Sequence, residues 1–193
     1  MSLHTMIATP ESVESLPTHL KTVEEFEAWE RQHPHEGSYE FVQGRIISKP
    51  GMKQDELDLA DFLLRRFMET PEFKQKHALC PELDSYVDGG RKRVPDLTYF
   101  TAEQRQAIRR GERVKTLFAI EILSDSETYE DILEKIQDYF DGGAVLVWYV
   151  VPKRRKIYVY TSPDDLKVYK NTELISAAPV VPDFQFSVAD LFA

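Results

Sequence analysis

Residues 144–152, AVLVWYVVP, constrain the fold more than any other part of the sequence. The segment is an almost unbroken apolar run, rich in valine and aromatic side chains. It is too short to cross a membrane, which takes about 18 apolar residues or more. Short runs of this kind are typical of strands that are buried on both faces of a sheet. The chain is therefore expected to build a sheet around a fully buried strand.

A strand and a helix are predicted directly before this segment. TLFAIEIL, at 116–123, is apolar apart from one acid and has the pattern of a strand. Apolar residues recur at helical spacing in 126–143, and Gly142 and Gly143 end that pattern. A strand, a helix and a buried strand in succession indicate a right-handed crossover over 116–152. The fold class is accordingly α/β or α+β, with a mixed central sheet flanked by helices.

The rest of the chain alternates between helical and strand patterns. Helices are predicted at 22–32, 53–69 and 102–112, a hairpin at 39–48, and strands at 82–88 and 94–100, with a loop at 88–93. KIYVYT and LKVYK then predict an appended C-terminal β-hairpin, followed by a short closing helical turn.

The composition fits one globular domain at 21–193, preceded by a flexible tail at 1–20. Of 193 residues, 42% are hydrophobic and 11% are aromatic, which is enough for a proper core. The first residues lack the basic start and apolar block of a signal peptide. A single cysteine, Cys80, excludes an internal disulfide and fits a reducing compartment. We therefore expect a cytoplasmic protein with no membrane partner.

The net charge of −9 bears on possible nucleic-acid binding. Proteins that bind long nucleic acids without sequence preference are usually basic. In this acidic protein, a polyanion would have to bind at a local basic patch. Basic clusters occur at 90–93, 109–110 and 153–156. Each cluster taken alone is more often a solvated turn than a binding site. The first cluster, with Arg91, Lys92 and Arg93, is the predicted nucleic-acid contact.

Two acids interrupt the apolar pattern of predicted strands. Asp96 follows Pro95, and Glu121 lies inside FAIEIL. If their strands are neighbours, the two carboxylates converge and can hold a magnesium ion, with a backbone carbonyl beside Glu121, that of Ile122, as a third ligand. For Asp96 taken alone, the more common interpretation is a strand that begins at the surface. Glu121 alone could equally form a structural ion pair, because an unpaired carboxylate in a core is costly.

Lys135 also admits two interpretations. It lies four residues after Asp131 in the predicted helix, a spacing that favours a weak surface ion pair. Alternatively, its amine stands beside the metal site, where it orients a water or stabilises phosphate charge. The spacing alone favours the surface pair.

Five motifs occur in an order that resembles a known family: YEFVQGRII, VPDLTYF, FAIEILSDS, a helical Asp, Lys and Tyr, and GGAVLVWYVVP. The chain resembles the Uma-type restriction endonuclease family, which is placed in the PD-(D/E)XK phosphodiesterase superfamily. The resemblance covers residues from about 22 to 193. It implies a restriction-endonuclease-like core with a divalent-metal site on its central strands.

The resemblance also assigns roles to individual residues. Asp96 and Glu121 correspond to the metal-binding acids, and Glu40 to an acid that supports them. Leu123 stands where the superfamily usually has its lysine, and Lys135 is the implied replacement. The histidine that the family often has near residues 53–54 is absent.

Two functions of different classes remain open on this basis. The first is a DNA endonuclease that uses Mg²⁺ or Mn²⁺ to activate a water for phosphodiester hydrolysis. The second is a catalytically silent module that binds nucleic acid or protein on the same fold. A homodimer is also expected, because exposed aromatic residues in the C-terminal hairpin would form an apolar surface that favours association. Alternatively, those rings cover the main sheet.

Overall fold

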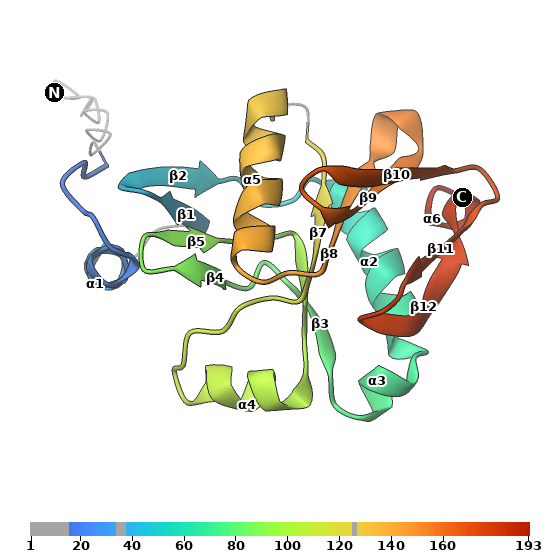
Figure 1. Ribbon diagram of the computed structural model, residues 1–193, viewed down its shortest axis with the longest axis horizontal. Coiled ribbons are helices and arrows are strands. Elements are labelled where there is room, and N and C mark those ends of the chain that lie inside the picture. Colours follow the sequence, from blue (N-terminus) through green and yellow to red (C-terminus); the bar gives the residue numbers. More distant parts are fainter. Residues whose placement is uncertain (1–15, 34–37, 125–126) are drawn as a thin grey trace, which may run out of the picture.

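The fold is described for residues 16–33, 38–124 and 127–193 of a computed structural model. Of the predicted tail at 1–20, residues 1–15 lie outside this described part. The described chain forms sheets of six, four and two strands, with helices packed on them (Figure 1). This arrangement confirms the mixed α/β class with a helix-flanked mixed sheet.

The six-stranded sheet contains the segments with the strongest apolar patterns. Its strand order is β10-β9-β8-β7-β6-β3, with β7 and β8 parallel and all other neighbours antiparallel. Helix α5 joins β7 to β8, which confirms the predicted strand–helix–strand unit. The bounds are β3 Ala78–Pro81, β6 Leu97–Phe100, β7 Phe118–Ile122, α5 Tyr129–Asp141, β8 Leu146–Val151, β9 Lys156–Ser162 and β10 Asp165–Lys170.

Strand β8 is buried at every position, because both faces of the sheet are covered. On one face, Trp148 and Val150 pack into a cluster with α2, β11, β12 and α6. On the other face, Val147 and Tyr149 pack against α5. The sequence predicts α2 and the final helical turn but not β11 and β12. The bounds are α2 Gln54–Met68, β11 Leu174–Ala177, β12 Val181–Ser187 and α6 Val188–Leu191.

The C-terminal hairpin of β9 and β10 extends the six-stranded sheet. Tyr160 is buried, and Tyr158 and Tyr169 are half-buried against the two core clusters. The aromatic rings therefore cover the main sheet, which was one of the two expectations. Leu166 and Val168, on the edge strand β10, are exposed.

The four-stranded sheet has the order β2-β1-β5-β4 and is covered by α1. Val23 and Phe26 of α1 pack against Phe41 of β1. Gln43 and Gly44 form the turn between β1 and β2, with φ of 49° and 87°, as a two-residue hairpin turn requires. The bounds are α1 Val23–Gln32, β1 Ser38–Val42, β2 Arg45–Lys49, β4 Ser85–Asp88 and β5 Arg91–Arg93.

The sequence predicts one strand at 94–100, but the chain changes sheets there. Strand β5 ends at Arg93 in the four-stranded sheet, and β6 begins at Leu97 in the six-stranded sheet. Pro95 has no N–H to give to a strand ladder, and the break falls at this residue. The predicted hairpin connection at 88–93 is confirmed, because β4 and β5 pair antiparallel, but the turn itself is only Gly89 and Gly90, since β5 begins at Arg91.

The remaining helices are short. They are α3 Pro71–Lys74, α4 Ala102–Arg109 and the 3₁₀ turn η1 Pro152–Arg154. Within the described ranges, the search for a helix of sufficient length and apolarity to span a membrane finds none.

Candidate functional site

Asp96 and Glu121 lie side by side where the chain passes from one sheet to the other. Strand β6 pairs with β7 so that Leu97 faces Ile120, and this register brings Asp96 next to Glu121. Asp96 is 7% exposed and Glu121 is 1% exposed. Asp96 therefore does not begin a strand at the surface, and the expectation that the two acidic strands are neighbours is met.

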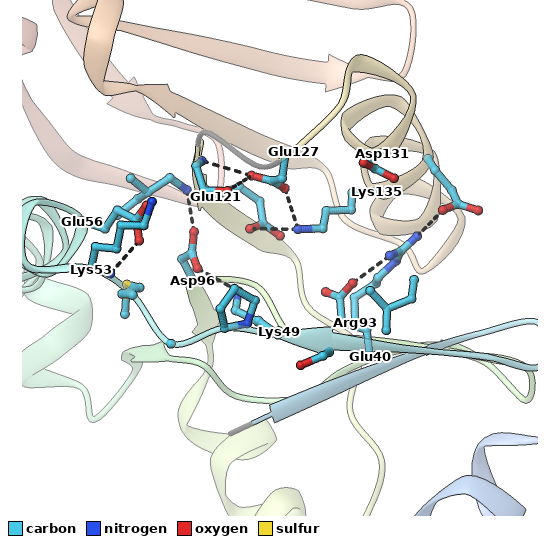
Figure 2. A pocket seen from close by; sticks show the side chains of 18 residues that line it. Glu40, Lys49, Lys53, Glu56, Arg93, Asp96, Glu121, Glu127, Asp131 and Lys135 are labelled. Carbon is cyan, nitrogen blue, oxygen red and sulfur yellow. Dashed lines mark hydrogen bonds and ion pairs between the residues drawn. The ribbon is translucent and has the colours of Figure 1, made fainter. Parts of the chain in front are cut away.

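Both acids line a cavity of about 250 Å³ between the two sheets (Figure 2). The four-stranded sheet contributes Glu40 from β1 and Lys49 from β2. Helix α5 contributes Lys135. The structure thus brings together the four residues that sequence and family resemblance single out: Glu40, Asp96, Glu121 and Lys135.

Lys135 and Tyr139, one turn apart on α5, both reach Glu121. The Nζ of Lys135 lies 3.7 Å from Glu121 Oε2 and 2.8 Å from Glu127 Oε1. The hydroxyl of Tyr139 donates a hydrogen bond to the other oxygen, Glu121 Oε1. Asp131, the alternative partner for Lys135, instead accepts hydrogen bonds from Thr128 at the start of the helix. The ammonium of Lys135 is therefore directed into the cavity.

Glu40 is held by two donors from β5 and the segment after it. Its Oε2 lies 2.8 Å from Arg93 Nη1, and its Oε1 accepts the N–H of Val94 at 3.0 Å. Burial alone would raise the pKa of Glu40, but Lys135 and Arg93 outweigh burial and hold it below its ordinary value. Glu40 is therefore ionised at neutral pH.

Burial dominates the electrostatics of Glu121. It raises the pKa of this carboxyl, while Lys135 and Lys49 act in the opposite direction. The pKa of Lys135 is raised, because Glu121 and Glu40 outweigh the effect of its own burial. At the centre of the cavity, acidic and basic side chains therefore shift one another's pKa in opposition to burial.

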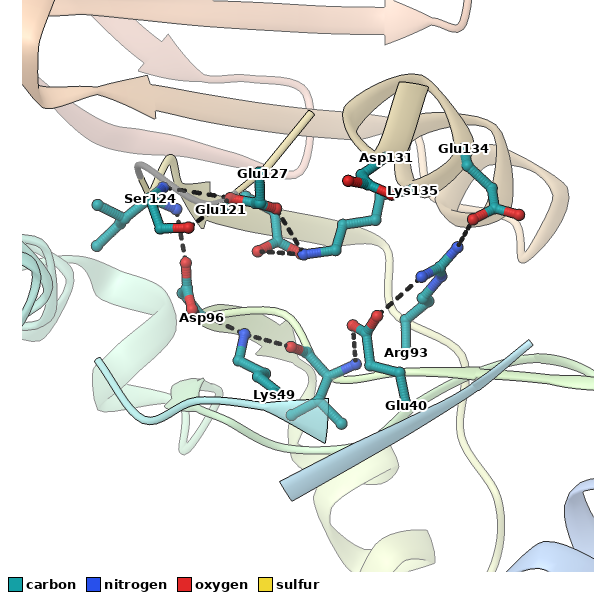
Figure 3. A network of polar contacts seen from close by, with 12 residues as sticks. Glu40, Lys49, Arg93, Asp96, Glu121, Ser124, Glu127, Asp131, Glu134 and Lys135 are labelled. Carbon is teal, nitrogen blue, oxygen red and sulfur yellow. Dashed lines mark hydrogen bonds and ion pairs between the residues drawn. The ribbon is translucent and has the colours of Figure 1, made fainter. Parts of the chain in front are cut away.

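Lys49 was not predicted from the sequence to belong to this site. Its Nζ lies 2.8 Å from Asp96 Oδ1 and 2.6 Å from the carbonyl oxygen of Val94 (Figure 3). Asp96 follows 47 residues later in the chain. No local pattern around Lys49 points to that partner, so only the fold reveals the pair.

The geometry argues against DNA contact by the predicted basic cluster. The side chains of Lys92 and Arg93 are each 2% exposed. Lys92 pairs with Glu30 and Asp84, and Arg93 pairs with acids that include Glu40. These two cations cannot reach a phosphate without breaking buried ion pairs.

Arg91, the third member of that cluster, is also engaged. It pairs with Asp88, Asp138 and Asp141, each at 2.7 Å. Its side chain is 17% exposed. The cluster therefore connects β5 to its neighbours and to α5, and Asp138 and Asp141, which pair with Arg91, are remote from it in the sequence.

The oxygen atoms around Asp96 suit a hard divalent cation. Asp96, directly before β6, and Glu121, in the adjacent strand β7, offer carboxylate oxygens, the donor type that Mg²⁺ prefers. The Lys49 ammonium already lies between Asp96 Oδ1 and the carbonyl oxygen of Val94, so oxygen atoms at this place bind a cation. Among the residues that the structure describes, no group of three or more His, Cys, Asp or Glu side chains is placed so that it could hold a metal ion by itself. A metal here would therefore keep several waters.

Two of three comparisons relate the chain to known proteins. A family model described as "Putative restriction endonuclease" matches residues 23–189. A solved structure described as "a putative nuclease belonging to DUF820", from Anabaena variabilis ATCC 29413, superposes with a TM-score of 0.74 at 21% identity. The match covers 89% of this chain and 97% of that one, and at this identity it shows a shared fold. The search of curated proteins finds no match.

Proposed function

This chain belongs to the Uma2 family of restriction-endonuclease-like proteins, and from that premise we propose that it is a metal-dependent endonuclease acting on DNA. The observation that carries the proposal is the convergence of Glu40, Asp96, Glu121 and Lys135 on one cavity. The family and the nuclease-like fold support hydrolysis of nucleic acid. The metal, the DNA substrate and the residue roles are the proposed part.

Asp96 and Glu121 would hold the cation, together with the carbonyl of Ile122. A bound Mg²⁺ or Mn²⁺ would supply a polarised phosphoryl oxygen and a water of lowered pKa. Tyr139 fixes the orientation of Glu121 through its hydrogen bond to Oε1. Ligands that are held in this way bind metal more tightly than free carboxylates do.

Lys135 is the proposed cation for the reacting phosphate. Its ammonium lies on the cavity wall beside Glu121, so it can pair with a phosphate oxygen that enters there. Positive charge aimed at developing negative charge in a dry site lowers the barrier. Glu40 acts on the reaction indirectly. It is bound to Arg93 and contributes negative charge near Lys135.

A catalytically silent binding module is the second candidate, and one observation favours it. Asp96 Oδ1 is already paired with Lys49, so the site is partly neutralised by the chain itself. A silent module would bind DNA or a protein on the same surface without cleaving DNA. The proposal also includes a cytoplasmic homodimer, to which Leu166 and Val168 on edge strand β10 offer exposed apolar side chains.

The test is cleavage of single- and double-stranded DNA with Mg²⁺ or Mn²⁺. The variants Asp96→Asn, Glu121→Gln and Lys135→Met should each lose about 100-fold or more of the activity, because each removes a group from the reacting centre. Glu130→Gln, on an exposed position of α5, should cleave like the wild type.

The result also separates the two candidates. Equal cleavage by the wild type and all variants would indicate a contaminating nuclease and refute the assignment. No cleavage by the wild type, together with DNA binding in a fluorescence anisotropy assay, would favour the silent module.

A further inference from the structure

Lys49 pairs with an oxygen that the proposed metal would also need. Its ammonium bridges Asp96 Oδ1 at 2.8 Å and the Val94 carbonyl oxygen at 2.6 Å. The second oxygen of Asp96, Oδ2, accepts the N–H of Ile122 at 2.6 Å. Figure 3 shows this chain of contacts along one wall of the cavity. Both oxygens of the carboxylate are therefore engaged, one of them by a full positive charge.

The pair is well shielded from water. The side chains of Lys49 and Asp96 are each 10% exposed. Burial alone would lower the pKa of Lys49, but Glu121 and Asp96 outweigh burial and raise it. Lys49 is therefore a charged counter-ion of both predicted metal ligands.

A divalent cation and the Lys49 ammonium would repel each other if both bound the carboxylate of Asp96. Both bind oxygen atoms, and both would use the carboxylate of Asp96. If both bound there, two positive charges would lie a few ångströms apart with little water between them, where repulsion is strong. Lys49 can move away, because it lines the cavity of about 250 Å³ and has a flexible four-carbon stem.

We propose that Lys49 competes with the divalent cation for Asp96 and thereby sets the affinity of the site for its metal. This inference rests on the metal site of the proposed function. Competition of this kind is reciprocal, so metal binding releases Lys49 to the same extent that Lys49 weakens metal binding. The released ammonium stays in the cavity as a second cation beside Lys135.

The direct test compares Mn²⁺ binding by the wild type and by Lys49→Met, using calorimetry and electron paramagnetic resonance. Methionine keeps the apolar stem but has no charge. We expect Lys49→Met to bind Mn²⁺ at least about tenfold more tightly than the wild type, which is within the range usual for coupled sites. Adding Asp96→Asn to Lys49→Met should remove the gain, because the contested carboxylate is lost.

Lys53→Met is the matched control. Lys53 lines the same cavity and carries the same charge, but it is exposed, and its backbone N–H bonds Glu56 at 2.8 Å. Its removal tests for a general effect of charge in the cavity. We expect its Mn²⁺ affinity to stay close to that of the wild type.

A second measurement uses the wild-type protein and does not depend on how Lys49→Met folds. Reductive methylation, read by peptide mass spectrometry, should label Lys49 more strongly when Mn²⁺ is present. Labelling of Lys53 should be unchanged. Labelling of Lys49 that does not respond to Mn²⁺ would overturn the competition.

The outcomes distinguish this inference from the proposed function. If the wild type and Lys49→Met bind Mn²⁺ equally, or if Lys49→Met binds more weakly, Lys49 is no competitor while the metal site stands. If neither protein binds Mn²⁺, the metal site and the inference both fail.

Discussion

Glu121 shows how a buried carboxylate is kept in place by several different partners. Its side chain is almost fully enclosed, and burial raises its pKa. Tyr139 donates to one oxygen, and the ammonium of Lys135 lies near the other. Buried charges of this type persist only where such contacts offset lost hydration. Removing one partner should therefore affect both folding and metal binding.

Tyr139→Phe tests this dependence at a single atom. The change removes the donor to Glu121 Oε1 and leaves that oxygen short of a partner in a buried place. We expect the free energy of unfolding to fall by about 1–3 kcal/mol. Mn²⁺ affinity should also fall, by about tenfold or more, because Tyr139 orients a proposed ligand. Urea unfolding and Mn²⁺ titration measure the two effects.

Tyr158→Phe is the control for this substitution. Tyr158 is half-buried and packs against the hydrophobic cluster that contains Tyr139. It should change neither quantity appreciably. A Tyr139→Phe protein with wild-type stability and affinity would contradict the positioning role.

The residues of the site differ in how visible they are in the sequence. Asp96 and Glu121 stand out, because acids are rare inside apolar strands. Lys49 does not, because a lysine at the end of a strand is ordinary and its partner is remote in sequence. The burial of the basic cluster at 91–93 cannot be inferred from the local sequence for the same reason, because acids that pair with it come from other parts of the chain.

At the scale of elements, helix α5 is the best predicted part of the site. Its start and end are set by local signals: a capping box at Thr128 and Asp131, and glycines after its last residue. These signals act within a few residues, so a sequence pattern captures them. The break before β6 is different, because it depends on which sheet each flanking strand joins. Likewise, β11 and β12 pair with each other and are held in place by packing on α2 and the main sheet.

Thr128→Ala tests the contribution of the cap to α5. The Thr128 side chain accepts the N–H of Asp131 at 3.2 Å, and Asp131 binds the Thr128 N–H in return. Losing the cap should lower the free energy of unfolding by about 0.5–2 kcal/mol. Thr128→Ser keeps the oxygen and should retain most of the stability. Equal unfolding free energies for the alanine and serine variants in guanidinium would show that the cap contributes nothing.

At the scale of the whole molecule, a buried ionic network connects the two larger sheets. Arg93 of β5 binds Glu40 of β1 at 2.8 Å and Asp138 of α5 at 2.6 Å. Because α5 packs on the six-stranded sheet, this network joins the four-stranded sheet to the rest of the protein. The sequence predicts most of the elements that take part, but not the way in which the sheets are connected.

The network predicts a particular dependence of stability on pH. The pKa of Glu40 is held below its ordinary value of 4.5 in the folded protein. Its ionised form therefore stabilises the fold fully above about pH 4.5, and this contribution is lost as the pH falls through the lower, folded value. Glu40→Gln lacks it, so the difference in Tm between the wild type and Glu40→Gln should be largest near pH 7 and shrink in acid.

Thermal unfolding between pH 7 and pH 3 measures this difference. Glu24→Gln, at an exposed position of α1, serves as the control and should melt close to the wild type throughout. A difference between Glu40→Gln and the wild type that stays constant over the whole pH range would rule out the ionic contribution.

The side chains of the cavity come from segments spread between Glu40 and Lys135. During synthesis on the ribosome, a nascent chain therefore carries the acids long before they are assembled. Glu40, Asp96 and Glu121 emerge first, and only the later arrival of α5 and β8 fixes them in place. Domains tend to fold as units once enough of the chain is present. A chain that ends before α5 and β8 would thus carry all three acids without the cavity in which the folded protein assembles them.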